Sequence, residues 1–254
     1  SAERTIQANC AARRIRGVHG NAIELRDRHA LEVRTGLPAE VEKLTFSAWT
    51  RPKELRGLRE IFRQEGDNRV LFAYQDNGST LALGLNVAGY TECDAKLDPN
   101  QVLDGRWHHG AATFDGQSMR VYFDGREVGR LERPGKIAVE PGAVSFLGSQ
   151  GGLANHFQGG LDDLRIYTAA LSADQVAALY RAGLESMDKQ SEELKRLIDS
   201  VYAPGNSFAE VLAGCRKNLL EKGVSLNAEL AEVLVARLRN AFSDDYTNFV
   251  TWTR

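Results

Sequence analysis

The sequence predicts a mainly β protein, in which a β-sandwich is followed by a C-terminal α-helical segment. Short alternating runs of apolar and polar residues are separated at regular intervals by Gly, Asn and Asp, which is typical of antiparallel sandwiches. Two Asp-Gly pairs, at residues 115–116 and 124–125, mark tight reversals within these runs. From residue 172 onward, apolar residues recur at helical spacing. We therefore expect a sandwich domain over residues 1–185 and a helical segment over residues 186–254.

The strands are predicted from alternation and from the residues that end each run. They cover residues 21–34 (two short strands or one bent strand), 44–52, 69–75, 79–87, 143–149 and 159–168, with a three-stranded meander within 106–129. Pro52 is expected to end its strand, because proline cannot donate to a central ladder. Asp76-Asn77-Gly78 marks a further turn. Both Asp-Gly pairs predict type I′ turns, whose two central residues have positive φ.

The helices are predicted from capping residues and apolar stripes. Ser172 and Gln175 form a capping box, and Gly183 is expected in the left-handed conformation after the last turn of that helix. Three more helices follow: one stops at Pro204-Gly205, one runs from the capping box of residues 207–210 to Gly223, and one starts at Ser225. Each has one apolar stripe and needs a partner surface, supplied by the other helices, the sandwich or a part of the protein outside this chain.

Composition and charge narrow the classes of function. The formal net charge of −2 gives no basic field that would favour nucleic acid or an acidic membrane surface. No apolar run approaches the ~20 residues that span a bilayer, so no membrane span is expected. Cys10, Cys93 and Cys215 are too few and too scattered for a zinc motif. We expect buried thiols, the alternative being one disulfide with one thiol left over.

Four segments carry a resemblance to a known family. They are GVHGNAIEL, LTFSAWTRP, GRWHHGAATFDGQSMRVYFDGREV and FQGGLDDLRIYTAALSADQVAALY, in that order. Over residues 17–185 the chain resembles laminin-G-like domains of the concanavalin A-like lectin/glucanase superfamily. The resemblance implies a two-sheet antiparallel jelly roll, with ligands on its concave side or loop rim. Residues 1–16 lack the aromatic-rich first strand of such domains, so either that strand is divergent or the chain is a piece of a longer protein.

The resemblance also implies a structural calcium ion, which many such domains hold where an early strand meets the closing strand. Asp162 would supply its carboxylate, together with backbone carbonyls near Gly20 and Asn21, and calcium prefers such oxygen ligands. The alternative is that Asp162 caps backbone amides or pairs with an arginine. A bound calcium would hold strands together and take no part in catalysis.

The paired carboxylates of a glycosidase are not evident in the sequence. Such enzymes place two carboxylates on either side of the scissile bond. The superfamily's enzymes carry theirs on one strand as Glu-x-Asp-x-x-Glu, which is absent here, and Glu40-Val-Glu42 and the pair Glu60 and Glu65 are the nearest spacings. The adjacent His108 and His109 face opposite sides of a strand and cannot share a metal. We expect no enzymatic activity, and a divergent glycoside hydrolase is kept as an alternative.

A sugar site needs an aromatic platform beside planar amides or carboxylates. Tyr74, Asp76, Asn77, Tyr90 and Asp94 lie in or beside strands and loops that could build such a site. The two other aromatic candidates, Trp49 and Trp107, are expected in the core.

We expect a non-catalytic binding or adhesion module for glycans or a protein partner, within a larger extracytoplasmic protein. The alternative is a structural spacer or accessory domain without a ligand of its own.

Overall fold

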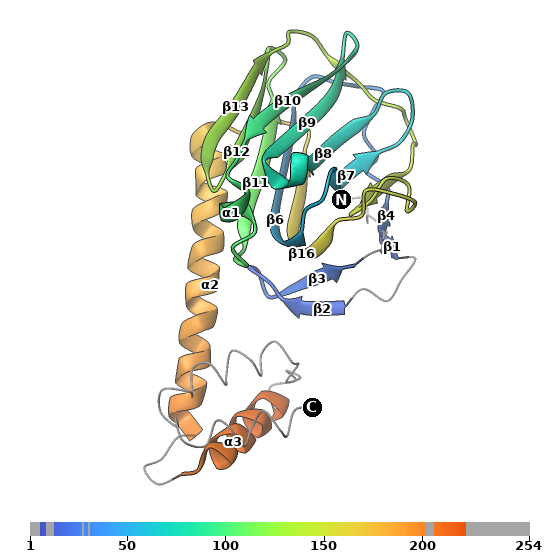
Figure 1. The fold of residues 1–254 in the computed structure, drawn as a ribbon. Coiled ribbons are helices and arrows are strands. Elements are labelled where there is room, and N and C mark those ends of the chain that lie inside the picture. The colour runs from blue at the N-terminus through green and yellow to red at the C-terminus, as the bar shows by residue number, and fades with distance from the viewer. Residues whose placement is uncertain (1–5, 9–12, 27, 30, 202–205, 222–254) are drawn as a thin grey trace. The chain divides into compact units, whose positions relative to one another are not determined.

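Figure 1 shows the fold, a computed structural model that describes all residues except 1–5, 9–12, 27, 30, 202–205 and 222–254. The chain divides into two units, residues 1–183 and residues 184–254. The boundary falls inside the long helix α2 (Ala173–Val201). Unit 1 contains every strand of the described chain.

The strands of unit 1 form two antiparallel sheets, which confirms the predicted sandwich. The nine-stranded sheet has the order β1 (Ile6–Ala8), β4 (Leu31–Val33), β15 (Ser145–Leu147), β7 (Arg59–Gln64), β8 (Val70–Gln75), β9 (Thr80–Val87), β14 (Ile137–Ala138) and β5 (Glu40–Val41), with β10 (Tyr90–Lys96) also paired to β9. The seven-stranded sheet has the order β13 (Arg126–Glu132), β12 (Ser118–Phe123), β11 (His108–Phe114), β6 (Leu44–Glu54), β16 (Gln158–Tyr167), β3 (Asn21–Leu25) and β2 (Arg13–Arg16). Two short helical turns, η1 (Asp76–Gly78) and α1 (Pro99–Val102), connect strands.

The inner faces of the two sheets meet in one apolar core. Phe46 of β6 contacts Phe62 of β7 and Phe72 of β8, with ring-centroid distances of 4.9 and 6.2 Å, and all three rings are fully buried. Each such side chain contributes about 1.5–3 kcal/mol when buried. Because side chains alternate along a strand, the residues next to these point outward, and they determine what each outer face carries.

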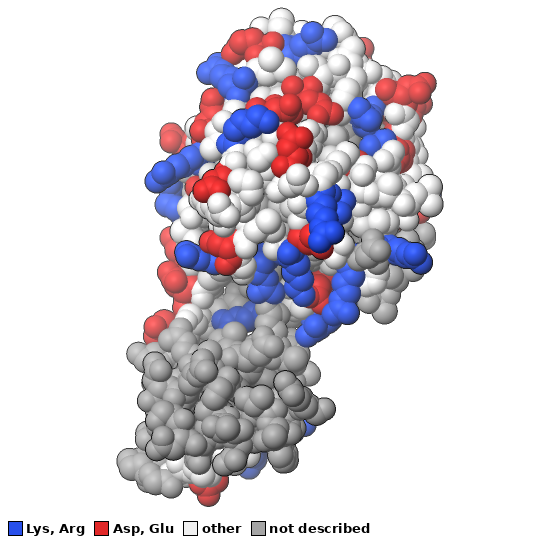
Figure 2. Space-filling model, in the orientation of Figure 1, with Lys and Arg blue, Asp and Glu red and all other residues white. Residues whose placement is uncertain are grey.

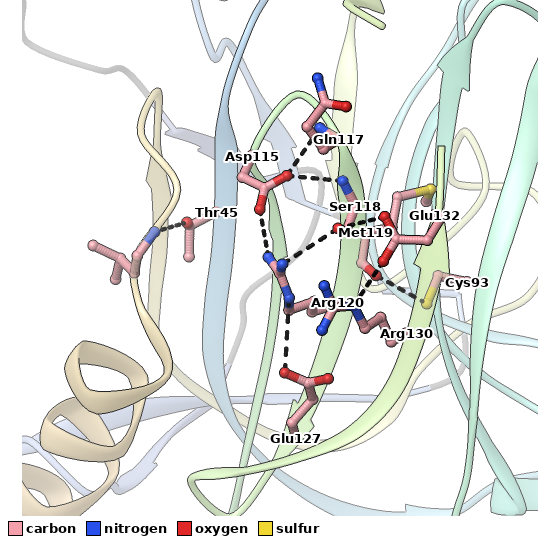
Figure 3. A network of polar contacts seen from close by, with 11 residues as sticks. Thr45, Cys93, Asp115, Gln117, Ser118, Met119, Arg120, Glu127, Arg130 and Glu132 are labelled. Carbon is pink, nitrogen blue, oxygen red and sulfur yellow. Dashed lines mark hydrogen bonds and ion pairs between the residues drawn. The ribbon is translucent and has the colours of Figure 1, made fainter. Parts of the chain in front are cut away.

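The two Asp-Gly turns differ from each other. At Asp124-Gly125 both residues have positive φ, 49° and 76°, so the predicted type I′ turn is confirmed. At Asp115-Gly116 this prediction is wrong, because only Gly116 has positive φ, 93°. The Asp115 carboxylate instead accepts hydrogen bonds from the backbone amides of Gln117 and Ser118, at 2.9 and 2.8 Å (Figure 3). These bonds shape the turn while Asp115 keeps an ordinary backbone conformation.

Two predicted ends of elements are wrong for identifiable reasons. β6 continues through Pro52 to Glu54, and Pro52 lies opposite Gly159, where the register of β16 shifts. A proline is tolerated at such an irregularity. α2 likewise continues through Gly183, which is not left-handed. A Cβ at Gly183 would overlap the indole of Trp49, so this glycine allows a close approach of helix and sheet.

The beginning of α2 covers part of the outer face of the seven-stranded sheet. Val176 packs against Tyr122 of β12, and both are buried. Tyr180 stacks on Trp49 of β6, with the ring centroids 5.6 Å apart, and Trp49 is buried as expected. This part of the sheet face is therefore closed to ligands.

Both predicted capping boxes are confirmed. The amide of Ser172 donates to Gln175 Oε1 at 2.9 Å, and the amide of Gln175 donates to Ser172 Oγ at 3.3 Å. Ser207 and Glu210 make the same reciprocal pair at the start of α3 (Phe208–Glu221). The predicted ends at Pro204-Gly205 and Gly223 and the predicted helix from Ser225 lie outside the described residues. Cys93 and Cys215 are buried free thiols, and Cys10 also lies outside the described residues.

Candidate functional site

The outer side chains of β7, β8, β9 and β10 form a continuous surface, which we call the β7–β10 face. Figure 1 shows these four strands side by side. The strand register arranges the outward residues in rows that cross the sheet. One row holds Glu60, Ala73, Ala82 and Asp94, and the next holds Arg63, Leu71, Gly84 and Glu92.

Small residues line the middle of this face. Ala73 of β8 and Ala82 of β9 lie between the acidic residues at the two ends of their row. A Cβ at Gly84 would overlap the ring and hydroxyl of Tyr90, so the glycine makes room for the tyrosine to lie across β9. Ala73, Ala82 and Gly84 therefore form a low floor between the longer side chains of β7 and β10, and both alanines are fully buried.

A hydrogen-bonded chain crosses this floor. The Tyr90 hydroxyl donates to Glu92 Oε1 at 2.5 Å, and Gln75 Nε2 donates to Glu92 Oε2 at 2.7 Å. The guanidinium carbon of Arg69 lies 3.9 Å from the centroid of the Tyr90 ring, a cation–π contact. Burial and the hydrogen bond to Glu92 raise the pKa of Tyr90, so the tyrosine stays a neutral donor. All four side chains are half-buried, which leaves part of each open to solvent.

Acidic and basic groups lie next to this hydrogen-bonded chain of side chains, at the end near η1. Asp76 Oδ2 accepts a hydrogen bond from Thr80 Oγ1 at 3.1 Å, and Lys96 Nζ lies 3.5 Å from the same oxygen. Lys96 also donates to Thr80 Oγ1 at 2.9 Å. Partial burial, and next the neighbouring Glu92, raise the pKa of the exposed Asp94. This edge offers carboxylate acceptors and one ammonium donor side by side.

A second polar group lies at the β7 edge of the same face. Arg63 donates to Glu60 Oε1 at 3.1 Å and to Glu65 Oε2 at 2.9 Å. Asn155 Nδ2 also donates to Glu60 Oε1, at 3.2 Å. Glu60 is fully buried, its Oε2 has no hydrogen-bond partner in the described structure, and burial raises its pKa. Sequence reasoning noted Glu60 and Glu65 only as a loose carboxylate pair.

The structure separates the residues that the sequence proposed as ligand contacts. Tyr90, Asp94 and Asp76 lie on or at the edge of the β7–β10 face. Asn77 lies in η1 with φ of 61°, and its Oδ1 accepts from the amide of Gly57 at 2.9 Å, so it shapes the turn.

Tyr74 lies elsewhere, in the core. It points inward and is fully buried, with its hydroxyl 2.9 Å from Thr50 Oγ1. A ligand on the surface would not reach it, because alternation along β8 turns Tyr74 to the inner side and its neighbour Gln75 to the outer side.

Sequence reasoning missed Arg69, Gln75 and Glu92. No local motif marks them, because they meet only through the pairing of β8 and β10 with β9. The structure also corrects the placement of Trp107, which is half-buried on an outer face.

Asp162 takes the amide-capping role that the sequence left open as an alternative to calcium. Its Oδ2 accepts from the amides of Val18 and His19, at 2.7 and 2.9 Å, and its Oδ1 accepts from the amide of Asp163 at 2.8 Å. The carbonyl of Gly20 accepts from the amide of Gly17 at 2.8 Å. N–H groups directed at these oxygens do not fit a cation, so we expect Asp162 to cap these amides without binding calcium. Asn21, the other residue of the expected calcium site, is exposed at the start of β3.

The adjacent histidines face opposite sides of β11, as predicted. His108 contacts Asp124 Oδ2 at 2.8 Å and Asp104 Oδ1 at 3.0 Å. His109 contacts Ser47 Oγ at 2.8 Å, and burial lowers its pKa to about 4. Within the described residues, no group of three or more His, Cys, Asp or Glu side chains is arranged to hold a metal ion.

The described helices include none that is both long and apolar enough to cross a bilayer.

Comparisons with known proteins bear on the fold. Residues 26–177 match the sequence model of a family described as the concanavalin A-like lectin/glucanases superfamily. No curated protein sequence matches the chain.

Solved structures share the architecture. Domain 4 of AbnA, a GH43 extracellular arabinanase from Geobacillus stearothermophilus in complex with arabinotriose, has a TM-score of 0.55 and 23% identity, covering 70% of this chain and 87% of that chain. The botulinum neurotoxin serotype G binding domain has a TM-score of 0.56 and 12% identity, covering 70% of this chain and 46% of that chain. The binding domain of Paraclostridial Mosquitocidal Protein 1 has a TM-score of 0.55 and 14% identity, covering 69% and 47%. The chain thus spans less than half of the two toxin domains, and these likenesses show the jelly-roll fold.

Proposed function

Since the chain belongs to the concanavalin A-like lectin/glucanase superfamily, we propose that it is a non-catalytic binding module that holds a glycan on the β7–β10 face. The observation that carries this proposal is the hydrogen-bonded chain of Tyr90, Glu92 and Gln75 over a floor of small residues. A sugar presents hydroxyl groups and an apolar C–H face, and this surface offers carboxylate and amide groups beside an aromatic ring.

The preorganisation of these groups supports binding. Tyr90 and Gln75 hold both oxygens of Glu92, so the acceptor is already oriented before a ligand arrives. A rigid polar surface loses less side-chain entropy on binding than a flexible one. The outer face of the other sheet is less suitable around Trp49, because α2 covers it there.

The carboxylates of this face do not favour catalysis. Glu60 and Asp94 share a row but are separated by two strands, and Glu60 is fully buried in an ion pair with Arg63, so it is closed to a substrate. Glycosidases separate their carboxyl groups by about 5–9.5 Å. Glu92 and Asp94 are closer and lie on one strand, but both oxygens of Glu92 already accept hydrogen bonds, from Tyr90 and Gln75. The next outward residue of this strand is the cation Lys96. We propose binding without hydrolysis, and incubation with a bound polysaccharide should release no reducing ends.

We also propose that the module belongs to a larger extracytoplasmic protein. Support comes from the similar fold of a domain in an extracellular arabinanase and of binding domains in toxins. A protein partner at the same face is the alternative ligand class.

Calorimetry with neutral polysaccharides, chosen from a glycan array, tests the proposed site. Glu92→Gln and Tyr90→Phe are expected to weaken binding about tenfold or more, because each removes a hydrogen-bonding group that is charged or paired with a charge. Glu132→Gln and Tyr167→Phe are matched controls on the other sheet and should bind like the wild type. No binding to any neutral glycan, or equal affinity in site and control variants, would refute the proposal.

A further inference from the structure

A second charged surface lies on the outer face of the seven-stranded sheet, at the end formed by β2, β3 and β6. We call it the basic cluster, and it consists of Arg13, Arg26 and Lys53 around Glu24. The side chain of Glu24 is only 3% exposed. Its Oε2 accepts from Arg26 Nη2 at 3.0 Å and from Arg13 Nη1 at 3.4 Å, and its Oε1 accepts from Lys53 Nζ.

The basic cluster has more positive than negative charge. One carboxylate holds three cations, and the three cationic side chains are 45%, 58% and 61% exposed. A lysine carries three donors and an arginine five, so each cation keeps donors that Glu24 does not use. Glu24 therefore fixes three exposed cations in one place without neutralising them. In Figure 2, blue side chains gather where β2 and β3 lie in Figure 1.

The strand register extends this surface toward an aromatic residue. Arg13, Glu24, Gly160 and Arg51 form one row across β2, β3, β16 and β6. Trp107 lies over Gly160, where a Cβ would overlap the indole ring. The guanidinium carbon of Arg51 lies 5.0 Å from the Trp107 ring centroid. The row is about 14 Å long from Arg13 to Arg51, and the half-buried ring of Trp107 lies over it one strand away from Glu24.

We propose that this surface binds an acidic polysaccharide, whose carboxylate or sulfate groups contact the basic cluster and whose sugar rings lie along the row toward Trp107. Cations that keep free donors match repeated anionic groups, and an indole matches the apolar face of a sugar ring. This site is separate from the β7–β10 face, and it does not depend on a neutral glycan binding there.

Other polyanions fit this surface less well. The exposed large apolar side chains of the described residues are Leu103, Val128, Leu153 and Leu184, and none belongs to this row. An anionic membrane would therefore find nothing to insert beside the cations. A single-stranded nucleic acid would stack successive bases on several aromatic side chains, whereas this row carries the single indole of Trp107.

The test measures binding of dextran sulfate and polygalacturonate by the whole chain, with neutral dextran as the uncharged probe. Binding to at least one acidic polymer is expected, and it should weaken as salt is added, because the cations are exposed. The double variant Arg26→Gln, Lys53→Gln is expected to lose about tenfold to thirtyfold in affinity. Lys53→Arg keeps the charge and should bind like the wild type.

Arg130→Gln is the matched control. Arg130 is 52% exposed, pairs with a glutamate and lies on β13, at the opposite edge of the same sheet. Melting curves of all variants confirm that each is folded. The proposal is overturned if neither acidic polymer binds at low salt, if the double variant binds like Arg130→Gln, or if single-stranded DNA binds more tightly through the same residues. The Tyr90→Phe variant should lose affinity for a neutral glycan and keep its affinity for the acidic polymers, so the two proposals can fail separately.

Discussion

The buried carboxylate of Glu24 should make the stability of unit 1 depend on acid pH. Burial alone would raise its pKa, but hydrogen bonds and charges from Lys53 and Arg26 outweigh burial and lower the pKa from 4.5 to about 2. A carboxyl group with a lowered pKa stabilises the folded state above its unfolded pKa. That stabilisation is lost as the pH falls through the folded pKa. The window for Glu24 therefore extends from pH 4.5 down to about 2.

The size of this effect follows from the shift and from the exposure of the partners. One pKa unit corresponds to about 1.36 kcal/mol, so the shift sets an upper limit of roughly 3 kcal/mol. The three cations are 45% to 61% exposed, and solvent screening reduces the net contribution to about 1–2 kcal/mol. Glu24→Gln should lower the free energy of unfolding by that amount at neutral pH and change it little near pH 2.

Urea unfolding followed by circular dichroism, at pH 6.5 and pH 2.5, measures the difference between wild type and Glu24→Gln. Other carboxylates titrate in the same range, so only the difference between the two proteins reports on Glu24. Glu132→Gln is the control, because Glu132 is 65% exposed and makes a surface pair. A Glu24→Gln difference that is equal at both pH values would refute the reasoning, because the destabilisation would then not come from the ionised carboxylate.

Three further outcomes are expected. Burial alone would lower the pKa of His108, but hydrogen bonds to two aspartates outweigh burial and raise the pKa. His108 therefore stabilises the fold below pH 6.5, and this contribution falls as the pH rises through the folded pKa. Urea titrations at pH 5.5 and 8.5 should show a loss of stability that His108→Gln lacks. Gly183→Ala should lower the free energy of unfolding by about 1–3 kcal/mol, because the new methyl group overlaps Trp49. Alanine normally stabilises a helix, so a higher melting temperature of this variant would contradict the observed contact. Calcium and EDTA should give the same melting temperature, because backbone amides occupy both oxygens of Asp162, and a calcium-dependent rise of several degrees would show that this carboxylate binds the ion.

The sequence predicted the strands that alternate clearly and missed those that do not. Its meander of residues 106–129 corresponds to β11, β12 and the start of β13. β7 was not predicted, because a register irregularity between Glu60 and Phe62 breaks its alternation and its outward residues are buried charges. β10 was not predicted as a strand either, because only Cys93 and Ala95 face the core in a run of polar residues. Alternation identifies a strand only where one face is apolar and the other is polar.

The candidate site was predicted less well than the fold, for a related reason. Tyr90 and Asp94 were selected as residue types that suit a sugar site, and they lie on the β7–β10 face. Gln75 and Glu92, which complete the hydrogen-bonded chain, are 17 positions apart in the sequence. Their contact depends on the register of three strands, and a single sequence does not specify that register. The same limit applies to Glu24 and Lys53, which are 29 positions apart.

The length of β6 explains why the seven-stranded sheet can be covered at one end and open at the other. β6 has 11 residues and extends about 36 Å, whereas the part of α2 in unit 1, residues 173–183, is only about 16 Å long. The outward residue Trp49 lies beneath this helix, and the outward residue Lys53 lies beyond it in the basic cluster. One strand thus supplies a buried contact for the helix and an exposed cation for a ligand. Because Lys53 lies outside the helix contact, its replacement should change ligand binding while Trp49 and α2 stay in place.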